Sequence, residues 1–287
     1  PELTTSVTAK SQSARALLAD IARDFAPAVF ANSLGAEDMV LTDLIVKAGL
    51  PIEIFSLDTG RLPAATYDLM AAVDTHYGLK LKVYFPRSEE VESHVRNHGI
   101  NAFYDSVNLR KACCHARKVE PLRRALAGKR AWITGLRAQQ AATRDGLPVH
   151  QYDEGNGLEK FNPLADWSEK EVWAYLKQHA VPYNALHDQS YPSIGCAPCT
   201  RAIAPGEDVR AADHRENLAR AAKMLPGFAD DAHPKALTGL AGFRATVPDR
   251  LPIFGATAIP GVWTATGLGS RGLLWAPIGA ELIASRL

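Results

Sequence analysis

Hydrophobic and polar positions alternate along the first two thirds of the chain between two kinds of short segment. Short apolar runs typical of buried strands occur at 28–34, 51–60, 80–86 and 130–137. Segments with apolar residues at helical spacing occur at 11–25, 37–50, 66–78 and 168–180, the last with Ser168 as a predicted N-cap. Strands that alternate with helices predict an α/β fold with a parallel sheet covered by helices on both faces.

This pattern changes near residue 213, where DHRENLARAAKMLPG begins. From about Leu251 the chain becomes rich in Gly, Ala and Pro. We therefore expect two parts, a nucleotide-binding type domain over 1–212 and an atypical segment over 213–287.

Charge and overall composition narrow the classes of partner. The 287 residues include 32 Lys and Arg against 31 Asp and Glu, so the net charge is +1. This balance gives no reason to expect a nucleic acid or a membrane surface as partner. The sequence shows no apolar run of membrane-spanning length and no secretory signal at its recorded start, Pro1. We expect a cytoplasmic location, with a monomer and a homo-oligomer both open.

Two turns after predicted strands are candidate ligand sites. The first contains Ser33 and Gly35, where small residues before a helix can offer backbone N–H groups to a phosphate. The second contains Asp58 and Arg61, which could hold a ribose or an anionic group beyond the carboxyl end of the next strand. An ordinary strand–helix turn and a solvated turn pair explain the same residues, because short glycine motifs are weak signals.

The cysteines form the most specific pattern. The chain has four, Cys113, Cys114, Cys196 and Cys199, and a reduced compartment favours metal ligands, catalytic thiols or core residues over disulfides. Four thiolates suit zinc or an iron–sulfur cluster, and the adjacent pair favours a [4Fe–4S] cluster over structural zinc. Lys118 follows Cys114 by four residues, which places a cation near such a centre.

Basic residues near the strand ends complete the candidate site. Arg137 and Arg144 follow the strand at 130–137, and Arg201 and Arg210 follow the second cysteine pair. Arginine forks match sulfate and phosphate oxygens, although a single arginine is more often a surface residue. Together with the phosphate-type turn they indicate a small dianionic substrate.

Six segments resemble the phosphoadenylyl-sulfate reductase family, and within it the assimilatory adenylyl-sulfate (APS) reductases. The resemblance spans about residues 10–212 and lies in the following segments, in this order: SLGAEDMVLTDLI, FSLDTGRLPAATYDLM, KACCHARKVEPLRRAL, WITGLRAQQAATR, KFNPLADWSEKEVWAYL and YPSIGCAPCTRAIAPGEDVRA.

The resemblance implies an adenine-nucleotide α-hydrolase-like fold and thioredoxin-dependent reduction of APS to sulfite and AMP. It implies a [4Fe–4S] cluster on the four cysteines, a set that members using the 3′-phosphorylated substrate lack. The family reaction uses a cysteine thiolate that attacks the sulfur of APS. By position, Ser33, Gly35 and Asp58 would line the nucleotide pocket, while Lys118, Arg144 and Arg210 would lie near the phosphosulfate.

The chain departs from this family after Ala212. The family nucleophile lies in a Glu-Cys-Gly-Leu/Ile-His segment near the C-terminus, and here no cysteine follows Cys199. Instead, the last 45 or so residues, including GLGSRG at 267–272, resemble the end of the FAD-dependent domain of the tRNA 5-methylaminomethyl-2-thiouridine biosynthesis bifunctional protein. The dinucleotide fingerprint of such a domain is absent.

Three interpretations follow from this departure. The first is an APS reductase with its catalytic tail replaced, and the second is a non-catalytic iron–sulfur protein that binds APS or AMP. The third, and the most remote, is a flavin-dependent tRNA-modification fragment.

Overall fold

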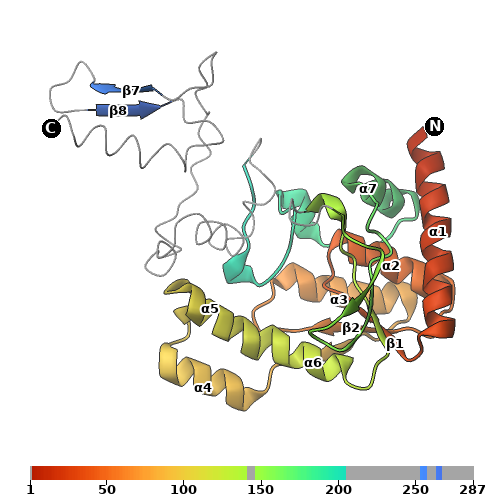
Figure 1. Ribbon diagram of the computed structural model, residues 1–287, viewed down its shortest axis with the longest axis horizontal. Coiled ribbons are helices and arrows are strands. Elements are labelled where there is room, and N and C mark those ends of the chain that lie inside the picture. The colour runs from red at the N-terminus through yellow and green to blue at the C-terminus, as the bar shows by residue number, and fades with distance from the viewer. Residues whose placement is uncertain (1, 141–145, 205–252, 257–262, 267–287) are drawn as a thin grey trace.

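The fold is seen in a computed structural model that describes residues 2–140, 146–204, 253–256 and 263–266. A long N-terminal helix leads into alternating strands and helices (Figure 1). The helices are α1 Glu2–Asp24, α2 Ala36–Lys47, α3 Ala64–Tyr77, α4 Ser88–His98, α5 Val107–Cys114, α6 Glu120–Leu126 and α7 Glu169–Gln178. The strands are β1 Ala28–Ala31, β2 Glu53–Leu57, β3 Lys82–Tyr84, β4 Ala131–Ile133, β5 His150–Asp153, β6 Leu158–Phe161, β7 Ile253–Ala256 and β8 Trp263–Thr266.

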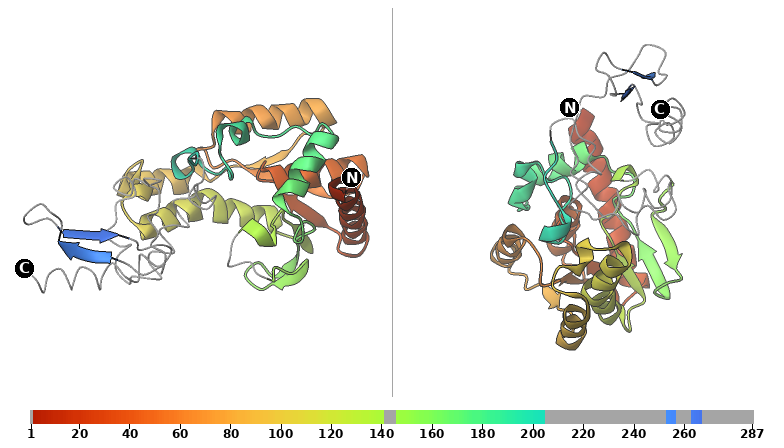
Figure 2. Two further views of the ribbon diagram at one scale, coloured as in Figure 1. Left: turned by 90° about the horizontal axis from the view of Figure 1, so that it is seen from above. Right: turned by 90° about the vertical axis from the view of Figure 1, so that its left-hand side faces the viewer.

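Six of these strands form one sheet in the order β3-β2-β1-β4-β6-β5. All neighbouring pairs are parallel except β5–β6, which forms an antiparallel hairpin at one edge (Figure 2). The predicted parallel sheet is therefore confirmed, with an antiparallel edge strand that the sequence pattern missed. Strands β7 and β8 form a separate antiparallel pair.

The core lies on both faces of the sheet. Alternate strand residues point to opposite faces: Phe30 and Ile133 join the larger cluster, packed with residues of α1, α2, α3 and α7. Val29 and Trp132 join a smaller cluster with residues of α6. Burial of such side chains stabilises each by about 1.5–3 kcal/mol, and this two-sided core explains why the strands read as continuous apolar runs.

Several short turns complete the described chain. They are the 3₁₀ turns η1 Ala102–Tyr104, η3 Ala138–Gln140, η5 Ala185–Gln189 and η6 Ala197–Cys199, and the π-helical turn η2 His115–Val119. Helix α7 begins as predicted, because Ser168 and Glu171 form a reciprocal capping box. Glu171 also binds Ser6 and Lys10 of α1, with Oε1–Oγ 2.5 Å and Oε2–Nζ 2.9 Å, so this carboxylate joins α1 to α7.

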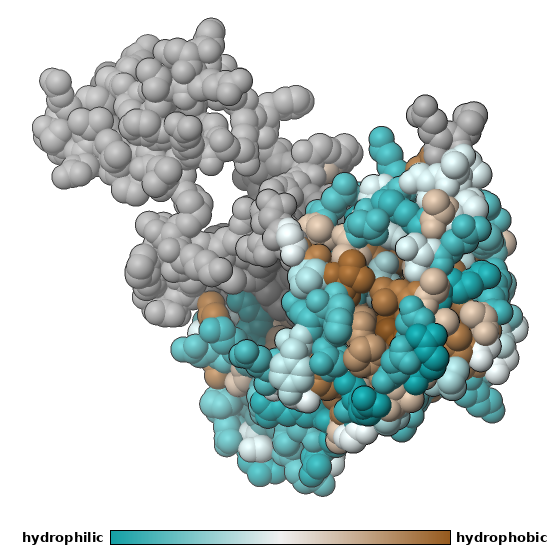
Figure 3. Space-filling view, turned by 45° about the vertical axis from the view of Figure 1, so that its right-hand side comes forward, coloured by the Kyte–Doolittle hydropathy of each residue, from teal (hydrophilic) through white to brown (hydrophobic). Residues whose placement is uncertain are grey.

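The outer surface is largely polar. The face drawn in Figure 3 is mostly hydrophilic, with apolar residues gathered in its middle. Within the described ranges, none of the helices combines the length and the apolar character needed to cross a membrane.

Candidate functional site

The loop after β1 is closed by its own side chains. Asn32 Oδ1 accepts a hydrogen bond from the Leu34 N–H at 2.7 Å. The N–H and the hydroxyl of Ser33 both donate to Asp38 Oδ2, each at 2.6 Å. The prediction of free backbone donors at this turn is therefore wrong for residues 33 and 34, because protein acceptors already occupy them. Gly35 is the N-cap residue of α2 and has no side chain to contribute.

The carboxylate that closes this loop is unusual. Asp38 is 6% exposed, and burial raises its pKa to about 6, while hydrogen bonds from Ser33 and from the Gly135 N–H oppose that rise. The preceding residue, Glu37, pairs with Arg137, with Oε1–Nε 2.7 Å. Arg137, a predicted substrate contact, is the partner of Glu37 in this ion pair.

The loop after β2 connects the sheet edge to the cysteines. Asp58 is buried and accepts hydrogen bonds from the Gly60 N–H at 2.7 Å and the Tyr67 hydroxyl at 2.9 Å. The next residue, Thr59, lies 3.3 Å from the Cys196 sulfur through its Oγ1, and its carbonyl accepts from Arg117 at 2.7 Å. This loop therefore lies between the nucleotide-type edge and the cysteine-bearing segments.

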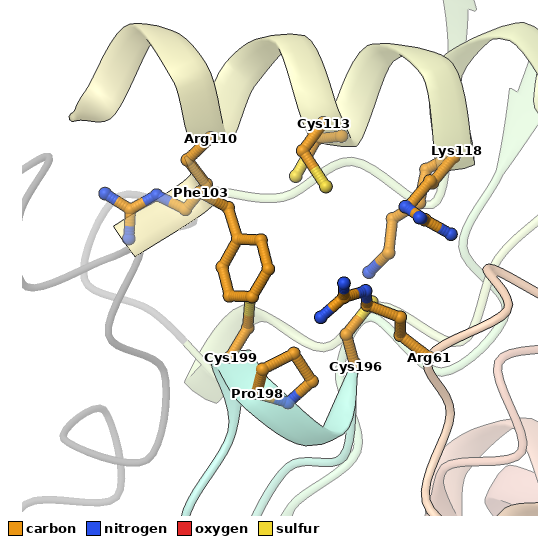
Figure 4. A pocket seen from close by; sticks show the side chains of 10 residues that line it. Arg61, Phe103, Arg110, Cys113, Lys118, Cys196, Pro198 and Cys199 are labelled. Carbon is orange, nitrogen blue, oxygen red and sulfur yellow. The ribbon is translucent and has the colours of Figure 1, made fainter. Parts of the chain in front are cut away.

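All four cysteines line one pocket. Cys113 and Cys114 lie at the end of α5, and Cys196 and Cys199 flank the turn η6 (Figure 4). Among the lining residues that the structure describes, none is an Asp or a Glu. The other lining residues are Arg61, Phe103, Arg110, Arg117, Lys118 and Pro198.

The helix that carries the first pair changes pitch immediately after it. Residues 115–119 form a π-helical turn between α5 and α6, a feature frequent at functional sites. Cys114 and Lys118 are therefore separated by a widened turn and not by an α-helical one. The Lys118 side chain points toward the space between this helix and η6 (Figure 4).

The second pair is held by a tight network. The Ala197 N–H donates to the Arg61 carbonyl at 2.8 Å, and the Tyr104 hydroxyl donates to the Pro198 carbonyl at 3.0 Å. The Thr200 hydroxyl donates to the Cys196 carbonyl at 3.1 Å. These bonds fix η6 against the loop after β2 and against η1.

Cations dominate the electrostatics of the pocket. Arg110 and Arg117 are buried, and the Arg61 guanidinium lies 4.9 Å from the centre of the Phe103 ring and binds Asn101 Oδ1 at 3.1 Å. Burial raises the pKa of the Cys113 thiol, and the adjacent Arg117 opposes this rise. A pocket with such cations favours an anionic occupant.

The side chains of the pocket are of the right kind to bind a thiolate-ligated metal centre. Their present positions, however, do not form a set of metal ligands. Among the described residues, no three His, Cys, Asp or Glu side chains lie close enough to hold one metal ion in this conformation. The four sulfurs share a pocket, and thiolates are the preferred ligands of soft iron and zinc sites. The donor set therefore fits a cluster.

The predicted residues divide into two groups. Ser33, Gly35, Asp58 and Arg137 follow parallel strands at the carboxyl edge of the sheet, whereas Lys118 lies with the cysteines. Arg144 and Arg210 lie outside the described residues. The sequence reasoning missed Arg110 and Arg117 as pocket residues, although each lies three positions along the chain from a cysteine of the vicinal pair.

The family model for the phosphoadenosine phosphosulfate reductase domain matches residues 27–202, which contain both groups. The chain belongs to this family. A second model, for FAD dependent oxidoreductases, matches residues 194–286, in accord with the resemblance expected for the C-terminal segment.

Similar proteins agree with the family assignment. Adenosine 5′-phosphosulfate reductase from Allochromatium vinosum is 59% identical over 195 residues, which cover 68% of this chain and 76% of that protein. The Burkholderia cepacia enzyme of the same name is 54% identical over 73% of this chain and 84% of that protein. The phosphoadenylyl-sulfate reductase of Candida auris, crystallised with phosphate, superimposes with a TM-score of 0.58 at 30% identity, covering 68% and 96%.

A more distant likeness concerns the fold alone. A Candida glabrata FMN adenylyltransferase variant matches with a TM-score of 0.50 at 14% identity over 69% of this chain. The sheet of this reductase-family chain is thus of the adenine-nucleotide α-hydrolase-like type, as the sequence predicted.

Proposed function

We propose that this chain carries the reductase part of an APS reductase of assimilatory sulfate reduction, an enzyme that converts APS to sulfite and AMP, and that the family's catalytic cysteine is missing from this sequence. The observation that carries the proposal is the convergence of four cysteines and several cations beside the loop after β2. Relatives at 59% and 54% identity that bear the name adenosine 5′-phosphosulfate reductase support the same substrate. We place the reductase part at residues 1–212 and treat 213–287 as a segment of separate origin.

The cofactor of this proposal is one [4Fe–4S] cluster bound by Cys113, Cys114, Cys196 and Cys199. The cluster would supply a compact anionic centre that ties α5 to η6. Arg117 and Lys118 would balance its charge, and Thr59 would hold Cys196 in place. Iron and sulfide analysis after anaerobic purification tests this assignment, and zinc in place of iron would overturn it.

The substrate is proposed to bind along the carboxyl edge of the sheet. In this placement Gly35, Asp58 and the Ser33 loop face the adenosine and Lys118 faces the phosphosulfate, the end to which the family resemblance also assigns Arg144 and Arg210. The separation of an edge lined by polar loops from a pocket lined by cations matches a ligand with a nucleoside at one end and an anion at the other. Titration calorimetry with APS and AMP tests this placement.

The chemistry needs a thiol that is not a cluster ligand. In the family reaction a cysteine thiolate attacks the sulfur of APS, AMP leaves, and an S-sulfocysteine forms. Reduced thioredoxin then attacks the cysteine sulfur, sulfite leaves, and thioredoxin ends as a disulfide after two electrons have passed. All four cysteines of these 287 residues are assigned to the cluster. A polypeptide of this sequence should therefore bind APS but release almost no sulfite when thioredoxin is supplied, because it lacks the cysteine that attacks APS.

A non-catalytic iron–sulfur protein that binds APS or AMP is the second candidate function. The observation that favours it is the absence of any cysteine after Cys199 in the sequence. A sulfite-release assay with thioredoxin distinguishes the reductase from the non-catalytic protein. The assay compares the unaltered chain with a variant in which a Glu-Cys-Gly-Leu-His tail follows Ala212. Rescue by the tail supports a reductase, and continued inactivity with intact APS binding supports the second candidate. A flavin spectrum would favour the remote tRNA-modification alternative.

A further inference from the structure

Two adjacent acids at the start of α2 reach across to the loop that follows β4. Asp38 accepts hydrogen bonds from the Ser33 N–H and hydroxyl through Oδ2, both at 2.6 Å, and its Oδ1 packs against the backbone of Gly135. Glu37 pairs with Arg137 at 2.7 Å. The side chains of one short segment thus join the loop after β1 to the loop after β4.

These two loops occupy a special position in the sheet. Strands β1 and β4 are neighbours, and the chain proceeds from β1 to β2 on one side while β4 lies on the other. In doubly wound sheets such a reversal opens a crevice at the carboxyl ends of the strands, where ligands bind. The contacts of Asp38 therefore join the two loops at the carboxyl edge where this rule places a ligand crevice, between β1 and β4.

The contact with the second wall leaves no room for a side chain. A Cβ atom added to Gly135 would lie 2.2 Å from Asp38 Oδ1 and 3.1 Å from the Glu37 Cβ. The first distance is far below van der Waals contact, so the Asp38 carboxylate packs directly against the Gly135 backbone. The opposite wall is constrained as well, because Leu34 adopts a left-handed φ of 65°, which is uncommon for a leucine.

Holding a carboxylate in this place has an energetic cost. Asp38 is 6% exposed, and taking an ionised group out of water is unfavourable unless hydrogen bonds replace its hydration. The N–H and the hydroxyl of Ser33 supply two such bonds. Strain and burial of this kind concentrate at functional sites.

We propose that Asp38 is a positioning residue that sets the width of the nucleotide crevice by clamping the Ser33 loop to the Gly135 backbone. The proposal rests on the proposed function, since it assigns the crevice to the adenine nucleotide. In this proposal Ser33 affects the nucleotide only through Asp38, because the N–H and the hydroxyl of Ser33 both donate to the Asp38 carboxylate. Glu37 and Arg137 form a second, outer tie between the same loops.

A double-mutant cycle read by AMP binding tests the clamp. Gly135→Ala should weaken AMP affinity by about tenfold or more, because the new methyl group displaces the carboxylate. Asp38→Ala should weaken it to a similar degree by releasing Ser33. The double variant should bind little more weakly than Asp38→Ala alone, since the atom that the methyl group meets at 2.2 Å is gone and the remaining contact, 3.1 Å to the Glu37 Cβ, needs only a small shift. Gly155→Ala, in the β5–β6 turn, is the matched control and should leave AMP affinity unchanged.

Several outcomes would overturn the clamp. Additive losses in the double variant would show that the two residues act independently, and unchanged AMP affinity in folded Gly135→Ala would show that the spacing does not matter. If Gly135→Ala fails to fold, AMP affinity is measured in the isosteric Asp38→Asn instead. Weaker AMP binding in that variant supports the clamp, and unchanged AMP binding overturns it.

A second measurement separates the clamp from the proposed function. If the unaltered chain does not bind AMP, the proposed function fails, and amide hydrogen exchange still reads the clamp. The Ser33 amide, which donates to Asp38, should be protected in the unaltered chain and should exchange at least about tenfold faster in Asp38→Ala. Equal exchange in both proteins would overturn the clamp whatever the ligand.

Discussion

The crevice at the β1–β4 edge and the cysteine pocket differ in how far their polar groups are satisfied within the protein. In the crevice, the donors of Ser33 and the carboxylates of Glu37 and Asp38 have protein partners within 2.7 Å. In the pocket, four thiols lie among arginines and Lys118 with no carboxylate in the lining. The first region is already organised before a ligand arrives, whereas the second calls for an anionic occupant.

The largest effect is expected from the loss of one cysteine of the pocket. Cys196→Ser should abolish cluster binding, because serine is a poor ligand for iron and no spare cysteine exists in the sequence. It should also lower the melting temperature, since η6 loses its tie to α5. Metal analysis and thermal unfolding under anaerobic conditions check this.

The control for that variant is Thr75→Ser on the exposed face of α3, which should retain the metal. A Cys196→Ser protein with a full complement of iron would contradict the four-cysteine assignment.

Removing a cation should weaken the pocket without dismantling it. Lys118→Ala should reduce APS affinity by roughly 1–3 kcal/mol, about 5- to 150-fold, if the contact is charge-assisted and desolvated. Lys111→Ala, on the same helix but exposed and outside the pocket lining, should have no such effect. Calorimetry with APS gives both values, and equal affinity in the two variants would remove Lys118 from the site.

A variant far from both regions should separate stability from function. Glu171→Gln should lower the unfolding free energy by about 1–3 kcal/mol, because a carboxylate with bonds to Ser6, Lys10 and Ser168 loses its charge. Burial raises the pKa of Glu171, but the hydrogen bonds from Ser168, Ser6 and Lys10 together outweigh burial and lower that pKa to about 2. This stability should be present above the ordinary glutamate pKa and be lost as pH falls toward 2.

Denaturant unfolding at several pH values checks this dependence, with the exposed Glu169→Gln as control. Metal content and APS affinity should not change. An unfolding free energy of Glu171→Gln that equals that of the unaltered chain at pH 7 would contradict the role of Glu171 in joining α1 to α7.

The smallest effect is the pH dependence that the crevice itself contributes. Burial raises the folded-state pKa of Asp38 to about 6, above its ordinary value, so the folded chain binds a proton that the unfolded chain releases. The contribution of Asp38 to stability should therefore rise as pH falls from about 7 to 4. Unfolding measured over this range should show a shallower dependence in Asp38→Asn, and parallel curves would contradict the assignment.

The sequence predicted the region of parallel strands better than the details of its loops. Apolar runs at 28–34 and 130–137 gave β1 and β4, because strands buried on both faces leave a strong local pattern. The hairpin β5–β6 was missed, since HQYD and LEKF are short and mostly polar. Helix α1 begins at Glu2 and not at residue 11. Its first turns are anchored by the buried Val7, but the polar residues around Val7 give no clear apolar pattern in the sequence.

The candidate site shows the same division between local and distant information. The gathering of the four cysteines in one pocket was implied by their pattern and is seen in the structure. The pairing of Arg137 with Glu37 joins residues 100 positions apart, which no local motif reports. The hydrogen bonds of Ser33 to Asp38 span five residues, but they depend on the conformation of the turn between them, which the sequence pattern does not specify.

The central claim is that the four cysteines form a single iron–sulfur centre beside the APS site. Iron and acid-labile sulfide determined per chain after anaerobic purification tests it most directly. The account predicts about four of each per chain, with broad visible absorbance that is lost in Cys196→Ser. Zinc in place of iron, or no metal in a folded chain that still binds APS, would contradict it.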